Sequence, residues 1–490
     1  MARFQFIQEI AQEYLGVEYL SAVLKQAGHH VDVLIGNSDA GIVKGVAEYR
    51  PDAACFSAIT GPHRWCMGKA EAIKAAFPSV RVIFGGGHPT FFPEMIRHPS
   101  VDMIVRGEAE GAILDIARCI DERTDCRGVL NVWSRIGGEI VENPVRPYLT
   151  DAELDALPRP DRELYYTKYP HLARSAVKAF LGQRGCPYSC SFCLNDKLKE
   201  LYRGKGPYVR RRSPGNIVAE IADVCAQYPV RTVHLYDEIF NTSPDWCMAV
   251  MDEYRRRVRR PYYCLVRADL MTREIAAKLK ESGCAGAWMG VETGDEELRL
   301  KVLGKRLTDK QIVDAARMLH EAGIPFRAYC QIGLPDETIE TAMKTVELCI
   351  RIKTDYPWCS VYQPYSKTGL VEYCIRKGYI PADFSVDRID SNCHRDSVLK
   401  LPDMRRLMNL AKFFQTAVLF PRAIHLIRRL IRLPANPLYE LWFGAVYFFV
   451  YIRSDGRPFL ESLSFALRYA WMQSGRGADT PALPKRPSAE

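Results

Sequence analysis

The sequence predicts an α/β protein made of two successive strand–helix alternations and a helical C-terminal region. Three observations indicate this class. Apolar strands alternate with amphipathic helices over residues 1–125, a second alternation of about six units starts at residue 176, and aromatic and basic helices follow residue 380. Such alternations are typical of parallel sheets covered by helices. The 490 residues suffice for roughly two to four domains.

The first alternation, residues 1–125, predicts a parallel sheet with helices on both faces. We expect strands at 3–8, 30–35, 53–59, 80–87 and 101–107, and helices at 15–28, 41–50, 67–77 and 108–122. Ligands of such sheets bind at the carboxyl ends of the strands. The stretches expected at those ends are residues 57–63, 85–90 and 106–110.

A linker, residues 126–175, separates this alternation from the second, which occupies residues 176–380. The linker contains a predicted hairpin through Gly137 and Gly138, followed by a Pro-rich connector. Beyond it we expect strands at 178–183, 232–237, 262–267, 285–292, 326–332 and 358–363, and helices at 216–228, 244–258, 273–283, 308–323 and 337–352. Such regular βα units predict a partial TIM barrel, (β/α)6, with its active site at the carboxyl ends of the strands.

Composition and charge exclude several classes of protein. The net charge of +9 is small for this length and no DNA- or RNA-binding signature is present, so we expect no nucleic-acid partner. The N-terminus, MARFQFIQEI, has no secretion-signal pattern, which predicts a cytoplasmic protein whose 16 cysteines do not form a disulfide framework. The most apolar run, residues 438–452, carries Glu440 and is too short for a transmembrane helix.

The stretch RGCPYSCSFC holds Cys186, Cys190 and Cys193 directly after the first expected barrel strand. A structural zinc site takes four ligands, usually from two CxxC pairs, and no second CxxC follows. A [4Fe–4S] cluster normally takes four cysteines, so three leave one iron open for catalysis. The alternative is a trio of buried structural cysteines, which a loop containing Gly and Pro at a barrel rim disfavours.

GCPYSCSFC resembles the CxxxCxxC signature of the radical S-adenosylmethionine (radical SAM) enzymes, with Phe192 in the aromatic position before the third cysteine. The resemblance runs from about residue 178 to about residue 379. It implies a partial radical SAM barrel whose cysteines hold a [4Fe–4S] cluster, with SAM chelating the open iron. It also implies a low-potential electron donor of the flavodoxin or ferredoxin type, whose electron cleaves SAM to methionine and a 5′-deoxyadenosyl radical.

Further rim stretches match the same family and imply SAM-binding residues. In LYDEIF, Asp237 and Glu238 stand where an acidic residue approaches the SAM amino group. Glu292 of MGVETGD ends the fourth strand, a position of ribose or amino contacts, and Gln331 begins QIGLPDET, which resembles the stretch on the adenine side. Arg267 suits the SAM carboxylate because guanidinium matches carboxylate geometry. The alternative for each of these SAM-binding candidates is a structural residue that forms a salt bridge at the barrel rim.

The first alternation resembles the Rossmann-like cobalamin-binding domain of the cobalamin-dependent radical SAM subfamily. LGVEYLSAVLKQAGHHVDVL matches its first helix and second strand, and FGGGHPTFFPE and VRGEAEG match the next two loops. The residues implied in cobalamin binding are Ser57, His63, Gly85, Gly86, Gly87, His88, Arg106 and Glu108. The DxHxxG motif of cobalamin mutases is absent from the expected loop, so the lower face of the cobalt is expected to be open or water-bound.

Beyond residue 380 the resemblance ends. We expect helices at 404–420, 422–433 and 436–454 within a C-terminal region, residues 381–475, and then a flexible tail, residues 476–490. Residues 404–474 hold ten Arg or Lys against three acidic residues. This pattern fits a helical cap over the barrel mouth, which we favour, or an interfacial helix on anionic lipid, and thus a peripheral membrane contact. Cys393 and His394 are adjacent and can act on a radical or a substrate, although a plain loop is the simpler interpretation.

We therefore expect a cobalamin-dependent radical SAM enzyme. The resemblance most often implies a C-methyltransferase, in which a substrate radical made by the 5′-deoxyadenosyl radical takes a methyl group from methylcobalamin. Two alternatives stay open: a non-methylating relative that carries out oxidative cyclisation or ring rearrangement, and a non-catalytic cluster-binding or membrane-associated protein. The substrate, a small molecule or a lipid, and the oligomeric state are not predicted.

Overall fold

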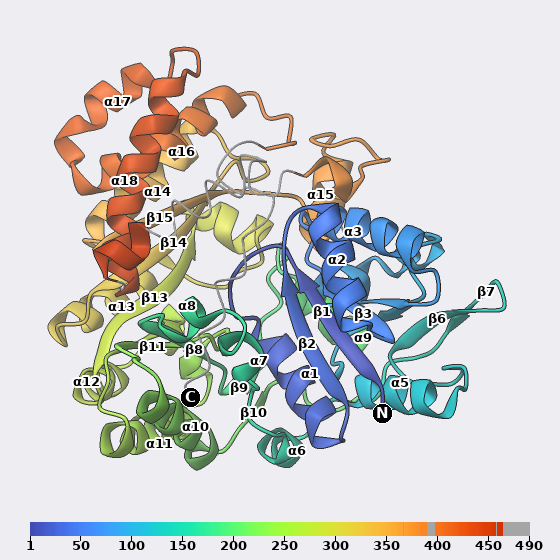
Figure 1. Cartoon of the computed structure of the whole chain (residues 1–490). Helices are drawn as coiled ribbons and strands as arrows, with labels where there is room; N and C mark the ends of the chain where they lie inside the picture. Colours follow the sequence, from blue (N-terminus) through green and yellow to red (C-terminus); the bar gives the residue numbers. More distant parts are fainter. Residues whose placement is uncertain (366, 390–396, 457, 464–490) are drawn as a thin grey trace. The chain divides into compact units, whose positions relative to one another are not determined.

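The computed structural model describes the chain except for residues 366, 390–396, 457 and 464–490. Two compact units are present (Figure 1). The first contains Met1–Arg146, Leu157–Ala173 and the described residues after Phe459, and the second contains Pro147–Ala156 and Arg174–Phe459. Cys393, His394 and the tail 476–490 lie outside the described residues.

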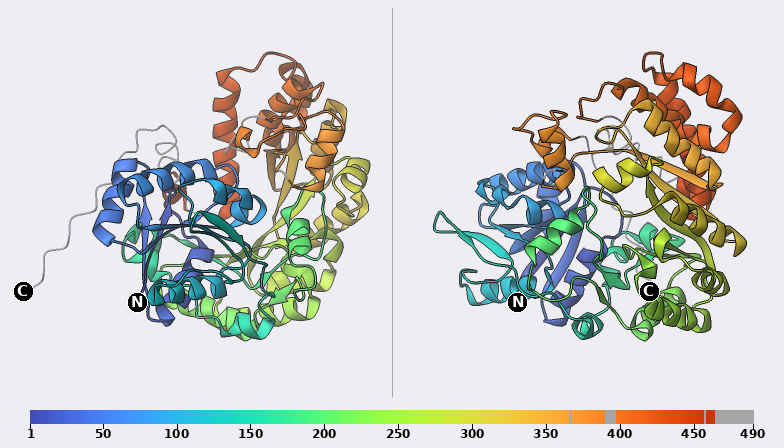
Figure 2. Two further views of the ribbon diagram at one scale, coloured as in Figure 1. Left: turned by 90° about the vertical axis from the view of Figure 1, so that its right-hand side faces the viewer. Right: turned by 180° about the vertical axis from the view of Figure 1, so that it is seen from behind.

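The first unit is built on a seven-stranded sheet with the order β2-β1-β3-β4-β5-β6-β7. Its strands are β1 (Arg3–Gln8), β2 (His30–Ile35), β3 (Ala53–Ser57), β4 (Arg81–Gly85), β5 (Met103–Val105), β6 (Val132–Ile136) and β7 (Glu139–Glu142). Its helices are α1 (Leu15–Gln26), α2 (Asp39–Tyr49), α3 (His63–Ala76), α4 (Gly87–Phe91), α5 (Glu110–Glu122), α7 (Glu163–Tyr166) and α8 (Pro170–Ala173), with a 3-10 turn at Pro93–Arg97. Strands β1 to β5 are parallel, and α1 packs on α5 while α2 packs on α3, which confirms the predicted α/β class (Figure 2).

Two details of this unit differ from the expected elements. Helix α3 begins at His63 instead of residue 67, because the polar His63 and Arg64 at its start hide the apolar periodicity. The hairpin β6–β7 pairs antiparallel with β5 and so extends the sheet beyond residue 125. A local pattern shows that a hairpin is present but not which strand it joins.

The second unit holds a parallel sheet with the order β15-β14-β13-β12-β11-β8. Its strands are β8 (Val177–Phe180), β11 (Thr232–Leu235), β12 (Tyr262–Val266), β13 (Cys284–Glu292), β14 (Phe326–Ile332) and β15 (Tyr356–Val361). The helices between them are α10 (Pro214–Gln227), α11 (Pro244–Arg257), α12 (Arg273–Glu281), α13 (Asp309–Glu321) and α14 (Ile339–Arg351). These elements confirm the predicted partial barrel of six strand–helix units.

Several short elements of the second unit were not expected from the sequence. They are α6 (Asp151–Ala156), α9 (Leu194–Leu201), α15 (Gly369–Arg376), the two-residue strands β9 (Gln183–Arg184) and β10 (Arg210–Arg211), and 3-10 turns at Phe240–Thr242, Ala268–Leu270 and Val386–Arg388. Elements of this length carry too few residues for a periodic pattern.

The C-terminal region forms α16 (Met404–Leu419), a 3-10 turn at Pro421–Ala423, α17 (Ile424–Leu430) and α18 (Pro437–Asp455). Helices α16 and α18 pack on edge strand β15, and α18 ends near the amino end of β11, where the Thr232 hydroxyl donates to the Gly456 carbonyl (3.4 Å). The cap over the barrel mouth that we favoured is therefore wrong, because these helices cover the open edge of the sheet. Within the described residues, no helix is long and apolar enough to cross a membrane.

Candidate functional site

The three cysteines lie on a loop that starts after the short strand β9. Gly185, which follows β9, has a φ of +89°, and a side chain there would collide with the carbonyl oxygen of Tyr208. Only glycine combines this backbone conformation with so close an approach. The turn that leads into Cys186 therefore depends on Gly185.

Cys186, Cys190 and Cys193 are half-buried, and α9 follows Cys193 directly. Burial raises the pKa of all three thiols, that of Cys193 to about 11, whereas the charges of Lys305 and Arg267 act to lower the pKa of Cys190. Across the part of the chain that the structure describes, no three or more His, Cys, Asp or Glu side chains are grouped so that they could hold a metal ion.

The loop formed by residues 186–193, called the cluster loop below, is anchored through Ser191. The Ser191 amide donates to the Leu303 carbonyl (2.9 Å), and its hydroxyl donates to the Val302 carbonyl (2.7 Å). Its own carbonyl accepts from the Leu370 amide (2.9 Å). Both acceptors belong to a π-helical turn, Leu298–Val302, and the residue after it, and such turns are frequent at functional sites.

Glu292, the last residue of β13, is fixed by two side chains. Lys305 Nζ donates to Glu292 Oε1 (2.8 Å), and Gln331 Nε2 donates to Oε2 (2.9 Å). Lys305 also donates to the Gly290 carbonyl (2.7 Å). Glu292 has a φ of +68°, a left-handed conformation that costs about 1 kcal/mol or more for a non-glycine residue. The structure thus brings together two predicted residues, Glu292 and Gln331, and adds Lys305, which the sequence analysis missed.

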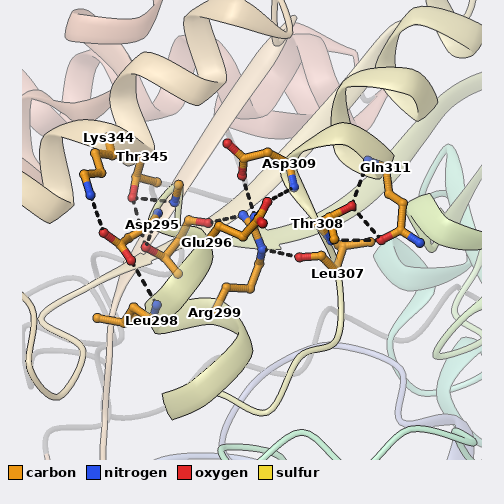
Figure 3. Close-up of polar contacts among 12 residues, drawn as sticks. Asp295, Glu296, Leu298, Arg299, Leu307, Thr308, Asp309, Gln311, Lys344 and Thr345 are labelled. Atoms are coloured by element: carbon orange, nitrogen blue, oxygen red, sulfur yellow. Dashed lines mark hydrogen bonds and ion pairs between the residues drawn. The ribbon is translucent and has the colours of Figure 1, made fainter.

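Figure 3 shows the buried network that fixes the segment between β13 and α13. Arg299 is completely buried, and its guanidinium donates to the carbonyls of Thr293 (2.7 Å) and Leu307 (2.7 Å) and to Asp309 Oδ1 (2.5 Å). The same segment carries Lys305 and the carbonyls that hold the cluster loop. Arg299 is therefore a positioning residue for both the Glu292 carboxylate and the cysteines.

Arg267, at the end of β12, joins the third strand to the cluster loop. Its guanidinium lies 3.4 Å from the centre of the Tyr188 ring, and its Nε forms an ion pair with Asp269 Oδ1 (2.7 Å). Its Nη2 donates to the Arg306 carbonyl (3.3 Å). Phe192, the other aromatic residue of the loop, packs instead against the apolar core of this unit.

The neighbours Asp237 and Glu238 have different surroundings. Asp237 is completely buried, and its Oδ1 accepts from the amides of Gly182 (2.7 Å) and Gln183 (2.6 Å). Burial raises the pKa of Asp237 to about 7. Glu238 is exposed, and its Oε2 accepts from Asn195 Nδ2 (2.6 Å), a side chain of α9. Asp237 thus fixes the backbone after β8, and Glu238 is the carboxylate beside the cluster loop.

The Gly-rich stretch after β14 is held by Glu337. Its Oε2 accepts from the amides of Gly333 (2.6 Å) and Leu334 (3.2 Å). Burial of this carboxyl raises its pKa from 4.5 to about 8. In the folded protein at neutral pH, Glu337 is therefore largely protonated.

We expect Glu337 to make the free energy of unfolding fall as the pH rises from 4.5 to about 8. In this window the unfolded chain has released a proton that the folded carboxyl keeps, so deprotonation favours unfolding. Glu337→Gln should flatten the slope, measured by chemical unfolding at several pH values across the window. The exposed Glu340→Gln is the control and should keep the wild-type slope. If the free energy of unfolding of Glu337→Gln depended on pH as steeply as that of the wild type, the raised pKa of Glu337 would be contradicted.

In the first unit, the loops after β3, β4 and β5 adjoin because these strands are neighbours. Gly86 has a φ of +95°, and a Cβ there would lie 2.8 Å from the Ala58 carbonyl oxygen. A Cβ at Gly85 or Gly87 would meet no atom within 4 Å. The glycines therefore leave open space at the carboxyl end of β4, which fits a large ligand lying close to the backbone.

The two predicted histidines of this unit are buried and stacked, with their ring centres 3.8 Å apart. His63 Nδ1 accepts from the Gly61 amide (3.0 Å), and His88 Nδ1 lies 3.1 Å from the Thr60 hydroxyl oxygen. The ring of Phe92 stacks on His88 at 4.8 Å. Both imidazoles are thus held by the loops in which they stand.

The other predicted residues of this unit stand at the ends of β3 and β5. Ser57 is exposed and Glu108 is half-buried. Arg106 Nε donates to the Thr90 carbonyl (3.2 Å), and its guanidinium lies 4.9 Å from the centre of the Trp133 ring. The eight residues therefore fall on the three adjoining loops and the helix starts that follow them.

Comparisons with known proteins match both units. The radical SAM superfamily matches residues 181–349, and the B12 binding domain family matches residues 12–117. An uncharacterized methyltransferase of Pyrococcus horikoshii is 24% identical over 368 residues, which cover 74% of this chain and 78% of that protein. An anaerobic magnesium-protoporphyrin IX monomethyl ester cyclase of Rubrivivax gelatinosus is 26% identical over 375 residues, which cover 73% of this chain and 65% of that protein.

Among solved structures, the cobalamin-dependent S-adenosylmethionine radical enzyme OxsB, with aqua-cobalamin and S-adenosylmethionine bound, has a similar fold. The sequence identity is 17% and the TM-score is 0.67, with 97% of this chain and 75% of that chain covered.

A B12-binding domain followed by a radical SAM domain makes this chain a cobalamin-dependent radical SAM enzyme. Its cofactors are a [4Fe–4S] cluster, SAM and cobalamin. The resemblance drawn from the cysteine signature and the glycine loops is thereby confirmed. Its relatives include both methyltransferases and cyclases. Which residues bind each cofactor stays a prediction.

Proposed function

We propose that the protein is a C-methyltransferase that acts at an unactivated carbon of a small-molecule or lipid substrate. The observation that carries the proposal is the combination, in one chain, of a radical SAM domain and a B12-binding domain. When bound, SAM and the cluster supply a radical for hydrogen abstraction, and cobalamin supplies a methyl group. The methyltransferase relative of Pyrococcus horikoshii supports this reaction. We expect the electron to come from a flavodoxin or ferredoxin type of donor.

We assign the cluster to Cys186, Cys190 and Cys193, whose three thiols leave one iron free for SAM. Gly185 sets the turn into this loop, and the hydrogen bonds of Ser191 hold its second half. These contacts would keep the three cysteines in place around a bound cluster.

We assign the polar groups of SAM to the barrel rim. The guanidinium of Arg267 suits the SAM carboxylate, and the exposed carboxylate of Glu238 suits the amino group. Glu292, fixed by Lys305 and Gln331, is suited to the sugar hydroxyls, since a carboxylate held by two donors keeps one orientation.

We assign cobalamin to the loops after β3, β4 and β5. A Gly87→Val variant should weaken cobalamin binding at least ~10-fold, because the new side chain fills the open space beside β4. Equilibrium dialysis with hydroxocobalamin measures this, and circular dichroism checks that the fold is kept. Gly68→Ala, at an equally open position of α3, should bind cobalamin normally. If Gly87→Val bound cobalamin as tightly as the wild type, the assignment of cobalamin to this loop would be wrong.

A second candidate function is oxidative cyclisation without methyl transfer, which the cyclase relative of Rubrivivax gelatinosus favours. Reconstitution under anaerobic conditions with SAM labelled at its methyl group, hydroxocobalamin and a strong reductant distinguishes the two. Methylation predicts 5′-deoxyadenosine together with labelled methyl on the extracted cobalamin. 5′-Deoxyadenosine with cobalamin that never acquires the label would favour cyclisation. If protein with a full cluster gave neither 5′-deoxyadenosine nor labelled cobalamin, both functions would be overturned.

A further inference from the structure

Helix α18 exposes a stripe of large apolar side chains. The exposed fractions are 71% for Leu438, 72% for Leu441, 47% for Trp442 and 57% for Phe449. These residues are spaced three, four and eleven positions from the first, so they share one face of the helix. Exposed apolar patches of this kind mark interaction sites on soluble proteins.

The preceding helix continues this surface with alternating basic and apolar residues. Leu426 and Arg429, which stand three positions apart on α17, are exposed on one face of that helix. Arg422 before α17 and Leu433 after it are exposed as well. The two helices are joined where the Tyr439 hydroxyl donates to the Leu430 carbonyl (3.0 Å). We call the exposed large apolar residues of 422–453, together with the exposed arginines of that range other than the ion-paired Arg428, the α17–α18 surface; they are Arg422, Leu426, Arg429, Arg432, Leu433, Leu438, Leu441, Trp442, Phe449 and Arg453.

The charge on the α17–α18 surface is positive and largely uncompensated. Arg428 pairs with Glu347 (3.7 Å), and Glu440 pairs with Lys412 (2.9 Å). Among the described residues, no acidic side chain lies within ion-pairing distance of Arg422, Arg429 or Arg432. A partner for this surface must therefore offer both negative charge and an apolar layer.

The opposite side of the two helices is fixed to the second unit, so this surface cannot turn inward. Trp442 stands at the boundary of the stripe, with its Nε1 donating to the Thr416 hydroxyl of α16 (2.8 Å). On the far side, Asp455 lies 3.6 Å from the guanidinium of Arg327 on β14. The Asn409 amide group also donates to the carbonyls of Ile431 and Leu433 (3.1 and 2.9 Å). The exposed stripe is therefore a permanent feature of the folded unit.

We propose that the α17–α18 surface docks the protein on an anionic lipid bilayer, with the leucines and Trp442 entering the headgroup boundary and the arginines contacting lipid phosphates. Basic amphipathic helices with an exposed Trp are typical of interfacial binding. A second copy of this chain fits less well, since a symmetric contact would place two positively charged surfaces against each other. The docking is independent of the reaction proposed above.

Vesicle flotation of the reconstituted full-length protein tests this directly. Wild type should float with phosphatidylcholine vesicles that contain phosphatidylglycerol, bind pure phosphatidylcholine much more weakly, and dissociate as salt rises. The partition coefficient should fall at least ~10-fold in Leu438→Ser/Leu441→Ser and about fivefold for each of Arg429→Gln and Arg432→Gln.

The matched control is Arg256→Gln/Arg257→Gln on α11, where two exposed arginines lie on a helix without exposed large apolar residues. It removes the same charge and should change the partition coefficient less than about twofold. The proposal is overturned if wild type does not bind anionic vesicles, or if the control lowers binding as much as Arg429→Gln/Arg432→Gln. It is also overturned if sedimentation velocity shows self-association that Leu438→Ser/Leu441→Ser abolishes while vesicle binding is absent.

Discussion

A Cys190→Ala variant is expected to lose the cluster and, with it, SAM cleavage. If the three cysteines hold the cluster as proposed, two thiols would not keep it in place, because each would bind only one iron and the other irons would have only water or weak ligands. Iron should fall from about four atoms per chain to the background level, and 5′-deoxyadenosine should fall ~1000-fold or more. Iron analysis and mass spectrometry of 5′-deoxyadenosine, both under anaerobic conditions, give the two readouts.

Cys225→Ala is the matched control for this experiment. Cys225 is also half-buried, but it lies on α10, outside the cluster loop. It should keep both the iron and the activity of the wild type. If Cys190→Ala retained a full cluster and cleaved SAM, the assignment of the cluster to these three cysteines would be wrong, and they would be interpreted as structural residues.

The alternation of the fold was predictable because parallel strands are buried on both faces. FRAYCQI was expected as a strand and is β14, Phe326–Ile332, residue for residue. Six such runs separated by amphipathic helices leave few topologies open, since crossovers between parallel strands are right-handed and short. The position of α16 and α18 was not predictable, because an apolar helix face does not say which strand edge it covers.

The candidate site was predictable where its signal is local in sequence. The three cysteines stand within eight residues, and Glu292 and Gln331 end strands whose carboxyl ends form one rim. Lys305 was missed because it stands in a loop, thirteen residues after Glu292, and reaches that carboxylate only through the π-helical turn that Arg299 holds. The helix that follows Cys193 was missed for a similar reason, since its eight residues bury no side chain.

The different roles of Asp237 and Glu238 were also hidden from the sequence. Both carboxylates stand after the second barrel strand, where the family resemblance places one acidic contact to SAM. The structure shows Asp237 bonded to two backbone amides and Glu238 exposed beside α9. The sequence does not distinguish them, because both stand in the loop beyond Leu235, where β11 ends and strand alternation no longer applies.

Lys305→Met is expected to have the second largest effect, because it leaves the Glu292 carboxylate without its charged partner. The two side chains are only 8% and 12% exposed and lie 2.8 Å apart. Removing one partner of a buried ion pair costs about 3–5 kcal/mol of stability. We therefore expect Tm, from calorimetry, to fall by about 5 °C.

The double variant Lys305→Met/Glu292→Gln separates stability from SAM binding. It removes both charges and should recover most of the lost Tm, since no uncompensated carboxylate is left buried. Its affinity for SAM, measured by the change that SAM causes in the EPR spectrum of the reduced cluster, should stay at least ~10-fold weaker than wild type. Arg212→Met is the matched control: it breaks the buried pair with Glu220 (2.6 Å) on α10, so it should lower Tm while SAM affinity is kept. Recovery of SAM affinity in the double variant would show that Lys305 and Glu292 only support the fold, whereas a persistent loss would place both among the groups that hold SAM.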